Sequence, residues 1–252
     1  MRHAIDIFLY GLTHLFRNLG AAIRLTGAIW VGASLLVFAL GYLVTGLPIG
    51  ALSVHPNSEG ELPDFLATFT MASFVITLLA GAWVSLIWSR YCLGADVPRG
   101  YLPSLKGLPF GGYLISLLLL IGLVAVVNLA IGSTELITIR FLPLPITLFV
   151  LPLLTIGISV WFILRLGAAL PATAAGQVLS LYQAWIGSRH QGIGLLTLFA
   201  LIVIVVLNIP TVVLGGMPVI NSVLSVISSW LLILMSTGWL VAIFRTIPPV
   251  AK

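Results

Sequence analysis

The side chains best able to bind or react in this sequence are hydroxyls set inside long apolar stretches. The stretches 65–88 and 223–244 each carry hydroxyls at intervals of one or two helical turns, so each set lies along one helix face. Such stripes let helices approach closely and bond to one another, or they line a path for a small neutral solute. Packing is the commoner role, because short hydroxyls also bond to their own backbone. The polar contacts predicted from these stripes are Thr70, Ser73, Thr77, Ser85, Ser225 and Ser229.

Two carboxamides, Asn128 and Asn208, also lie inside apolar stretches, toward the ends farther from the side of the N-terminus. A hydrogen bond between them across two helices is the expected arrangement, and such a bond contributes about 0.6–2 kcal/mol in a membrane protein. A pair of amides that binds a solute is the alternative.

The residues that most reactions need are missing from the apolar stretches. Histidines occur only at His3, His14, His55 and His190, and the acids are scattered outside the stretches. Intramembrane proteolysis needs a Ser–His pair or two aspartates, and metal or haem sites need ligands that converge. The only cysteine, Cys92, forms no disulfide framework. We therefore expect no catalytic residues, no cofactor and no metal site, and so a protein that is not an enzyme.

The elements that must position these residues are membrane-spanning helices. Of the 252 residues 60% are hydrophobic and only 7% are charged, which excludes a water-facing exterior. Crossing the hydrocarbon layer takes about 20 apolar residues in a helix, and six stretches are long enough. The sequence thus predicts one all-α domain, a polytopic transmembrane helical bundle of six spans that form three hairpins. The predicted spans are 25–44, 65–88, 113–131, 145–164, 193–214 and 223–244.

Two further segments are predicted to lie at the membrane surface. Residues 1–24 alternate apolar and polar residues at helical spacing, as expected of an amphipathic interfacial helix. A second interfacial helix is expected at 176–187. Basic and aromatic side chains beside the spans are candidates for contact with lipid headgroups. These candidates are Arg2, Arg17, Arg24, Arg90, Arg165 and Trp185.

The basic residues predict the orientation of the chain. All of them except Arg140 fall on the side of the N-terminus once six spans are drawn, while most acids fall on the other side. This positive-inside bias places both termini in the cytoplasm. The expected location is the bacterial inner membrane, and the expected partners are the bilayer and its anionic headgroups on the cytoplasmic side. Another membrane protein is a further candidate partner. The net charge of +5 reflects orientation, so no nucleic-acid partner is implied.

Short motifs beside the spans carry a resemblance that covers nearly the whole chain. They are Arg17-Asn18, Trp88-Ser89-Arg90-Tyr91 with Leu93-Gly94, and Arg165-Leu166-Gly167 through Leu170-Pro171 to Ser180-Leu181 and Ala184-Trp185. Together they resemble a broad group of poorly characterised bacterial six-helix integral membrane proteins, similar to the membrane domain attached to some glycerophosphodiester phosphodiesterases. The resemblance implies a fold and a location. The phosphodiesterase domain itself is absent from this sequence, so the resemblance implies no catalytic residues.

Two function classes remain. The first is a non-enzymatic multi-pass membrane protein with an accessory, assembly or membrane-organising role that acts through lipid or helix contacts. The alternative is a transporter or channel for a small neutral or amphipathic solute, built on the hydroxyl stripes. A proton-coupled carrier is disfavoured, because ionisable residues embedded in the spans normally mark ion pathways and none occurs here.

Overall fold

The computed structural model describes residues 2–45, 64–97, 100–138, 150–214 and 217–247. Every regular element within these ranges is a helix, which confirms the all-α prediction. Six helical segments are long and apolar enough to cross a membrane, so the chain is a multi-pass membrane protein. These segments are Leu19–Val44, Ala67–Leu93, Phe110–Ser133, Leu151–Ala174, Ile193–Val213 and Val219–Thr246.

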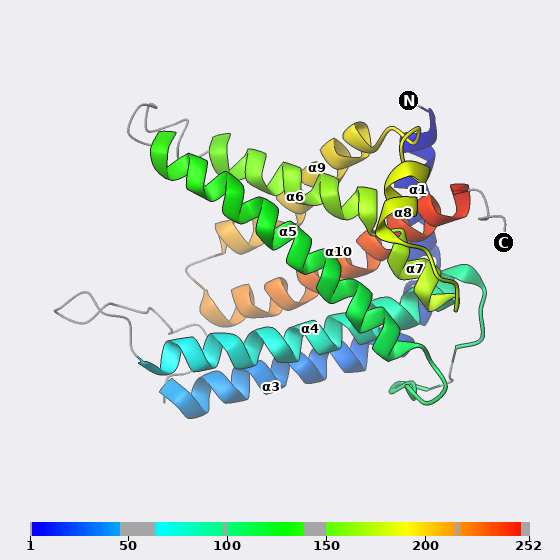
Figure 1. Ribbon diagram of the computed structural model, residues 1–252. Coiled ribbons are helices and arrows are strands. Elements are labelled where there is room, and N and C mark those ends of the chain that lie inside the picture. The colour runs from blue at the N-terminus through cyan, green and yellow to red at the C-terminus, as the bar shows by residue number, and fades with distance from the viewer. Residues whose placement is uncertain (1, 46–63, 98–99, 139–149, 215–216, 248–252) are drawn as a thin grey trace.

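Long helices alternate in direction, and shorter helices gather at one end of the molecule (Figure 1). In chain order they are α1 (Arg2–Arg17), α2 (Leu19–Ala22), the π-helical turn η1 (Ile23–Gly27), α3 (Ala28–Thr45), α4 (Asp64–Leu93), α5 (Phe110–Thr138), α6 (Leu151–Leu166), α7 (Ala169–Ala174), α8 (Leu181–Gly187), α9 (Ile193–Val213) and α10 (Pro218–Thr246).

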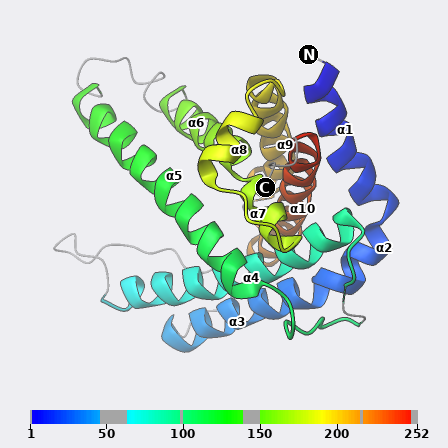
Figure 2. The ribbon, with the colours of Figure 1, turned by 45° about the vertical axis from the view of Figure 1, so that its right-hand side comes forward.

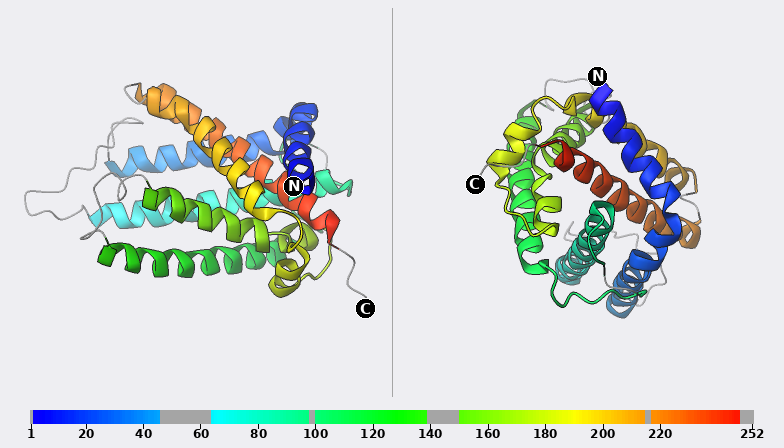
Figure 3. Two further views of the ribbon diagram at one scale, coloured as in Figure 1. Left: turned by 90° about the horizontal axis from the view of Figure 1, so that it is seen from above. Right: turned by 90° about the vertical axis from the view of Figure 1, so that its right-hand side faces the viewer.

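The six spans pair as three antiparallel hairpins around a central helix. Helix α3 packs along α4, α5 along α6, and α9 along α10, as the sequence predicts. Helix α10 also contacts α1, α3, α4 and α7, and it lies in the middle of the bundle when the molecule is viewed end-on (Figure 3). Of the apolar window of α10, 56% is buried, against 6% for α5. The last helix in the sequence is therefore the one around which the others assemble.

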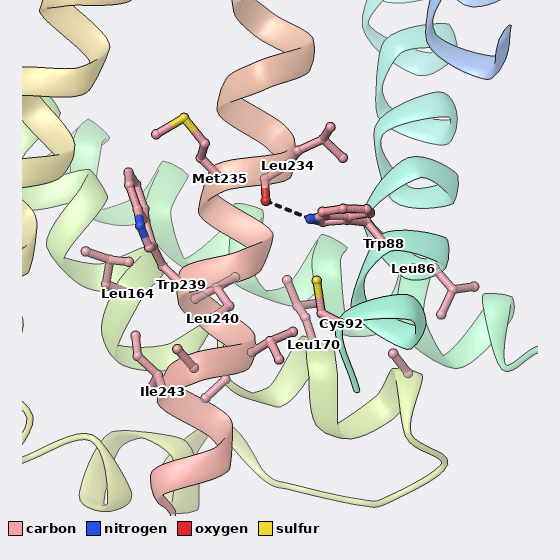
Figure 4. Packing of buried hydrophobic residues seen from close by; sticks show 14 of the residues in the cluster. Leu86, Trp88, Cys92, Leu164, Leu170, Leu234, Met235, Trp239, Leu240 and Ile243 are labelled. Carbon is pink, nitrogen blue, oxygen red and sulfur yellow. Dashed lines mark hydrogen bonds between the residues drawn. The ribbon is translucent and has the colours of Figure 1, made fainter. Parts of the chain in front are cut away.

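The packed core lies toward the end that holds α1, α7 and α8. We call this the basic end, because α4, α6 and α10 all end there (Figure 1), with Arg90, Arg165 and Arg245 in their last turns. Figure 4 shows core side chains of α4, α6, α7 and α10, among them Trp88, which donates its indole N–H to the carbonyl oxygen of Leu234 at 3.1 Å. Away from this end α5 and α6 diverge from α3 and α4 (Figure 2), and Val126 and Leu129 of α5 are exposed.

The N-terminal helix is shorter than expected and packs on the bundle. It ends at Arg17 rather than at residue 24, because Asn18 leaves the helical conformation (φ −116°, ψ 25°) before α2 begins at Leu19. Small and apolar residues of α1 face α9 and α10, whereas a second apolar row that includes Leu9 and Phe16 is exposed. A helix with two apolar rows can contact the protein on one side and lipid on the other.

Other boundaries also differ from the sequence prediction, since α4, α5 and α10 extend at both ends beyond the predicted spans 65–88, 113–131 and 223–244. The second interfacial helix begins at Leu181 rather than at residue 176. Gly176 adopts a left-handed conformation (φ 75°), and Ser180 forms a capping box with Gln183, so the helix starts after both. The predicted fourth span, 145–164, begins in residues outside the described ranges, and its described part ends at Leu166.

Candidate functional site

Two cavities of about 340 Å³ each flank the central helix α10. The first, here called the α3 cavity, lies between α3, α4 and α10, and the second, the α5 cavity, lies between α4, α5, α6, α7 and α10. The α3 cavity is lined by Trp30, Ala33, Ser34, Val37, Phe38, Thr77, Asn221, Ser222, Ser225, Val226 and Ser229. The α5 cavity is lined by Ser85, Tyr113, Leu117, Leu120, Ile121, Val124, Ala125, Asn128, Ile163, Leu170, Ile233, Ser236, Thr237 and Leu240.

The α3 cavity unites the two hydroxyl stripes that the sequence singles out. Thr77 of α4 lines it together with Ser225 and Ser229 of α10. The Ser229 hydroxyl donates to the carbonyl oxygen of Ser225 at 2.6 Å, and Ser34 of α3 donates to that of Trp30 at 2.9 Å. These protons are used within their own helices, so the hydroxyls present mainly acceptor oxygens to an occupant.

The α5 cavity has apolar walls and a few polar groups. Ser85, Tyr113 and Asn128 line it from α4 and α5, and Ser236 and Thr237 from α10. Both α10 hydroxyls donate to the carbonyl oxygen of Ile233, at 3.0 and 2.7 Å. The Tyr113 hydroxyl lies beside Ser85. An apolar occupant would thus leave the hydroxyl protons of Ser236 and Thr237 satisfied.

The predicted bond between Asn128 and Asn208 is wrong. Asn128 accepts a hydrogen bond from Ser159 of α6 at 2.9 Å, whereas Asn208 is exposed on α9 and donates to the carbonyl oxygen of Ile204 at 2.8 Å. The reason is the hairpin pairing, since α5 packs on α6 and α9 packs on α10. Asn208 is therefore not a contact within the bundle.

The other predicted polar residues fall into two groups. Ser85 and Thr77 line cavities, while Thr70 is exposed and Ser73 is half-buried with its hydroxyl oxygen unpartnered. Ser222 and Ser236, which belong to the α10 stripe, also line the cavities. Sequence reasoning missed four other cavity residues, because none belongs to a periodic polar stripe and the aromatic one suggested the membrane interface. These are Ser34, Tyr113, Asn221 and Thr237.

The residues predicted to contact lipid headgroups also differ in where the structure places them. Arg17 and Arg24 are exposed, and the side chain of Arg2 lies outside the described residues. Arg90 is occupied within the fold: its guanidinium donates to the carbonyl oxygens of Ala174 at 2.9 Å and of Asp96 at 3.1 and 3.2 Å. It ties α4 to the end of α7, so its structural role contrasts with the predicted role at the lipid surface.

Arg165 and Trp185 are brought together at the junction of α6 and α8. The Arg165 guanidinium carbon lies 4.3 Å from the centre of the Trp185 ring and 5.5 Å from that of Trp161. The two indole rings meet edge to face at 5.3 Å. Cation–π contacts of this kind hold a guanidinium plane while its edge stays able to donate hydrogen bonds.

A histidine lies in an aromatic cluster where α1 meets α4 and α10. The His14 ring stacks on Tyr10 at 5.3 Å and lies 5.8 Å from Trp88 and 6.0 Å from Tyr91. Its Nε2 atom is buried without a hydrogen-bond partner. Burial first, and then the positive charge of Arg245, lower the pKa of His14 below its usual value of 6.5.

We expect this cluster to make the stability of the protein depend on pH. The folded state binds the His14 proton less readily than the unfolded state, so the stabilisation is complete above about pH 6.5. It is lost as the pH falls through that value toward the lower pKa of the folded state. Thermal unfolding of the purified protein at several pH values should show this loss. His14→Gln should weaken the pH dependence, whereas the same change at the exposed His190 should leave it in place. Equal dependence in both variants would contradict the prediction.

Comparisons with known protein families, with curated proteins and with solved structures find no match to this chain.

Proposed function

We propose that this chain is a multi-pass protein of the bacterial inner membrane that binds lipid acyl chains beside α10. In this role it is an accessory, assembly or membrane-organising protein and catalyses no reaction. The observation that carries the proposal is the α5 cavity, which lies within the membrane-spanning part and has mainly apolar walls. Its volume of about 340 Å³ falls at the small end of ligand pockets, which run from about 300 to 1,000 Å³.

The chemistry of the walls favours an acyl chain over a hydrophilic solute. The hydroxyls of Ser236 and Thr237 donate to a backbone carbonyl oxygen of α10, so their protons need no further hydrogen-bond acceptor. A solute that carries several hydrogen-bonding groups would find few donors there, and an unsatisfied polar group in an apolar site costs roughly 1–3 kcal/mol. An acyl chain has no such groups.

A photoreactive phospholipid can test the occupant. The full chain is reconstituted with a phospholipid that carries a photoactivatable group in its acyl chain, and the crosslinked peptides are mapped by mass spectrometry. We expect labelling to concentrate on the cavity-lining parts of α5 and α10. Ala125→Phe, which places a ring in the α5 cavity, should reduce this labelling severalfold. Ala130→Phe is the matched control, because Ala130 is exposed on the same helix and is not part of the cavity lining. Labelling spread evenly over the exposed faces of α5 and α9 would overturn the proposal.

A transporter for a small neutral or amphipathic solute is the second candidate. It is favoured by the meeting of two polar stripes in one cavity, with Thr77 of α4 and Ser229 of α10 on the same lining. If this cavity is a transport path, Thr77→Val together with Ser229→Ala should lower solute flux into proteoliposomes. Unchanged flux in the double variant would remove this candidate.

The proposed orientation places the basic end in the cytoplasm, together with both termini. It is supported by Arg90, Arg165 and Arg245, which lie in the last turns of α4, α6 and α10 at one end of the bundle, in accord with the positive-inside rule. A reporter fused after Lys252 should read cytoplasmic and one inserted at Asn57 periplasmic. The reverse pattern would contradict the orientation.

A further inference from the structure

The junction of α6 and α8 holds an arginine whose guanidinium packs on two indole rings but makes no hydrogen bond within the described part of the chain. The Arg165 guanidinium carbon lies 4.3 Å from the centre of the Trp185 ring and 5.5 Å from that of Trp161, and the two rings meet edge to face. The Nε atom of Arg165 is buried and has no hydrogen-bond partner. Arg90, by contrast, donates its guanidinium hydrogens to carbonyl oxygens of the fold.

The charge around Arg165 is uncompensated within the described part of the chain. The charged group that acts on it is Arg189, which has the same sign, and no carboxylate contributes. Ser188, the residue before Arg189, donates its hydroxyl to the carbonyl oxygen of Arg165 at 3.1 Å, so the two arginines lie close to one another and their like charges repel. An anion placed between them would turn this repulsion into two attractions.

The surroundings identify the kind of anion. Arg165 lies in the last turn of a membrane-spanning helix, at the basic end. Beside it, α8 and the segment before it expose Val178, Tyr182 and Ile186, which suit the boundary between headgroups and acyl chains. An anionic group that carries an apolar tail fits a surface that combines these apolar residues with two arginines.

We propose that Arg165 and Arg189 bind the phosphate group of an anionic lipid headgroup, with Trp161 and Trp185 holding the Arg165 guanidinium in place. The planar guanidinium donates two parallel hydrogen bonds to phosphate oxygens, and Arg189 adds a second charge. This inference rests on the proposed function as a lipid-binding protein and assigns it a headgroup class. Trp161 and Trp185 are positioning residues.

The test measures which lipids accompany the protein. The full chain is equilibrated in nanodiscs of phosphatidylglycerol and phosphatidylcholine, and the lipids retained after transfer to mild detergent are quantified by mass spectrometry. The wild-type chain should retain phosphatidylglycerol preferentially. Arg165→Gln and Arg189→Gln should each lower this preference by about tenfold, the loss expected for a charge-assisted hydrogen bond. Arg165→Lys should lose most of it, because an ammonium group cannot donate two parallel bonds.

The control variant is Arg17→Gln, which removes the same charge from an exposed position at the same end of the molecule. An equal loss in Arg17→Gln and Arg165→Gln would overturn the proposal, since it would indicate that anionic lipid is attracted to any positive charge at the basic end. Arg189 is exposed, so Arg189→Gln tests the site without disturbing the core.

Competition with inorganic phosphate tests whether the site recognises the phosphate group alone or the whole lipid headgroup. Displacement of phosphatidylglycerol by phosphate, but not by chloride at equal ionic strength, would assign recognition to the phosphate group alone. Retention of the lipid against phosphate would assign recognition to the whole headgroup. If Arg165→Gln keeps the wild-type preference while photoreactive lipid still labels the α5 cavity, the inference fails and the proposed function stands. Loss of cavity labelling in the wild-type chain would instead remove the proposed function.

Discussion

Gly11→Leu is expected to detach the N-terminal helix from the bundle. A Cβ atom at Gly11 would meet the indole ring of Trp239, with Nε1 at 2.6 Å, and the carbonyl oxygen of Met235 at 3.3 Å. The opposing residue is Gly238, where an added Cβ atom would lie 3.2 Å from the Gly11 Cα atom. The two backbones meet directly here, and contacts of small residues are a common way for membrane helices to approach closely.

The cost combines overpacking with the loss of a specific contact. Extra methylenes in a packed interface cost about 1–3 kcal/mol, and occasionally more when neighbours cannot move. Trp239 cannot move freely, because its indole N–H donates to the carbonyl oxygen of Phe8 at 3.3 Å and its ring stacks on Phe8 at 5.8 Å. We expect α1 to become sensitive to protease in Gly11→Leu and the midpoint of thermal unfolding to fall.

Gly20→Leu provides the matched control for this change. It adds the same side chain to the same N-terminal segment, but an added Cβ atom at Gly20 meets nothing within 4 Å. The thermal midpoint and the protease pattern should stay close to those of the wild-type chain. Equal effects of the two substitutions would show that the Gly11–Gly238 contact does not hold α1 in place.

Trp88→Ala is expected to have the largest effect on stability, about 3–5 kcal/mol, the usual cost of removing a buried aromatic side chain. Trp88 is 1% exposed and joins α4 to the central helix through its hydrogen bond to the carbonyl oxygen of Leu234. Its ring also stacks on Tyr91 at 5.2 Å and contacts His14 of α1. The substitution therefore loosens three helices at once. Trp88→Phe, which keeps a ring but removes the N–H donor, should cost less.

Trp83, a second tryptophan of α4, serves as a control that distinguishes loss of side-chain volume from loss of the hydrogen bond to Leu234. Trp83 is half-buried, and its indole nitrogen has no hydrogen-bond partner. Trp83→Ala should therefore destabilise the protein less than Trp88→Ala in thermal unfolding of the two variants under the same conditions. A larger effect at Trp83 would contradict the role given to the α4–α10 bond.

The hydropathy of the sequence predicted the spans well, because each side chain adds its own transfer free energy to a helix whatever its neighbours in space. The ends were less predictable. Asn18 leaves the helical conformation where α1 ends, and Ser180 starts α8 through a capping box, so both boundaries depend on local geometry rather than on hydropathy. Thr77 and Ser229, which belong to two different hydroxyl stripes, were both predicted to make polar contacts, and the structure places both residues in the lining of one cavity.

What the sequence determined by itself is that this chain crosses a membrane as six apolar helices joined in hairpins, since burial in lipid is decided by the composition of each stretch. The tertiary structure alone decided which polar groups meet. Asn128 bonds to Ser159 instead of Asn208, and Arg165 lies on Trp185, because helix partners are set by shape and packing between segments far apart in the chain. It also decided that α10 lies at the centre, with a cavity on either side of it.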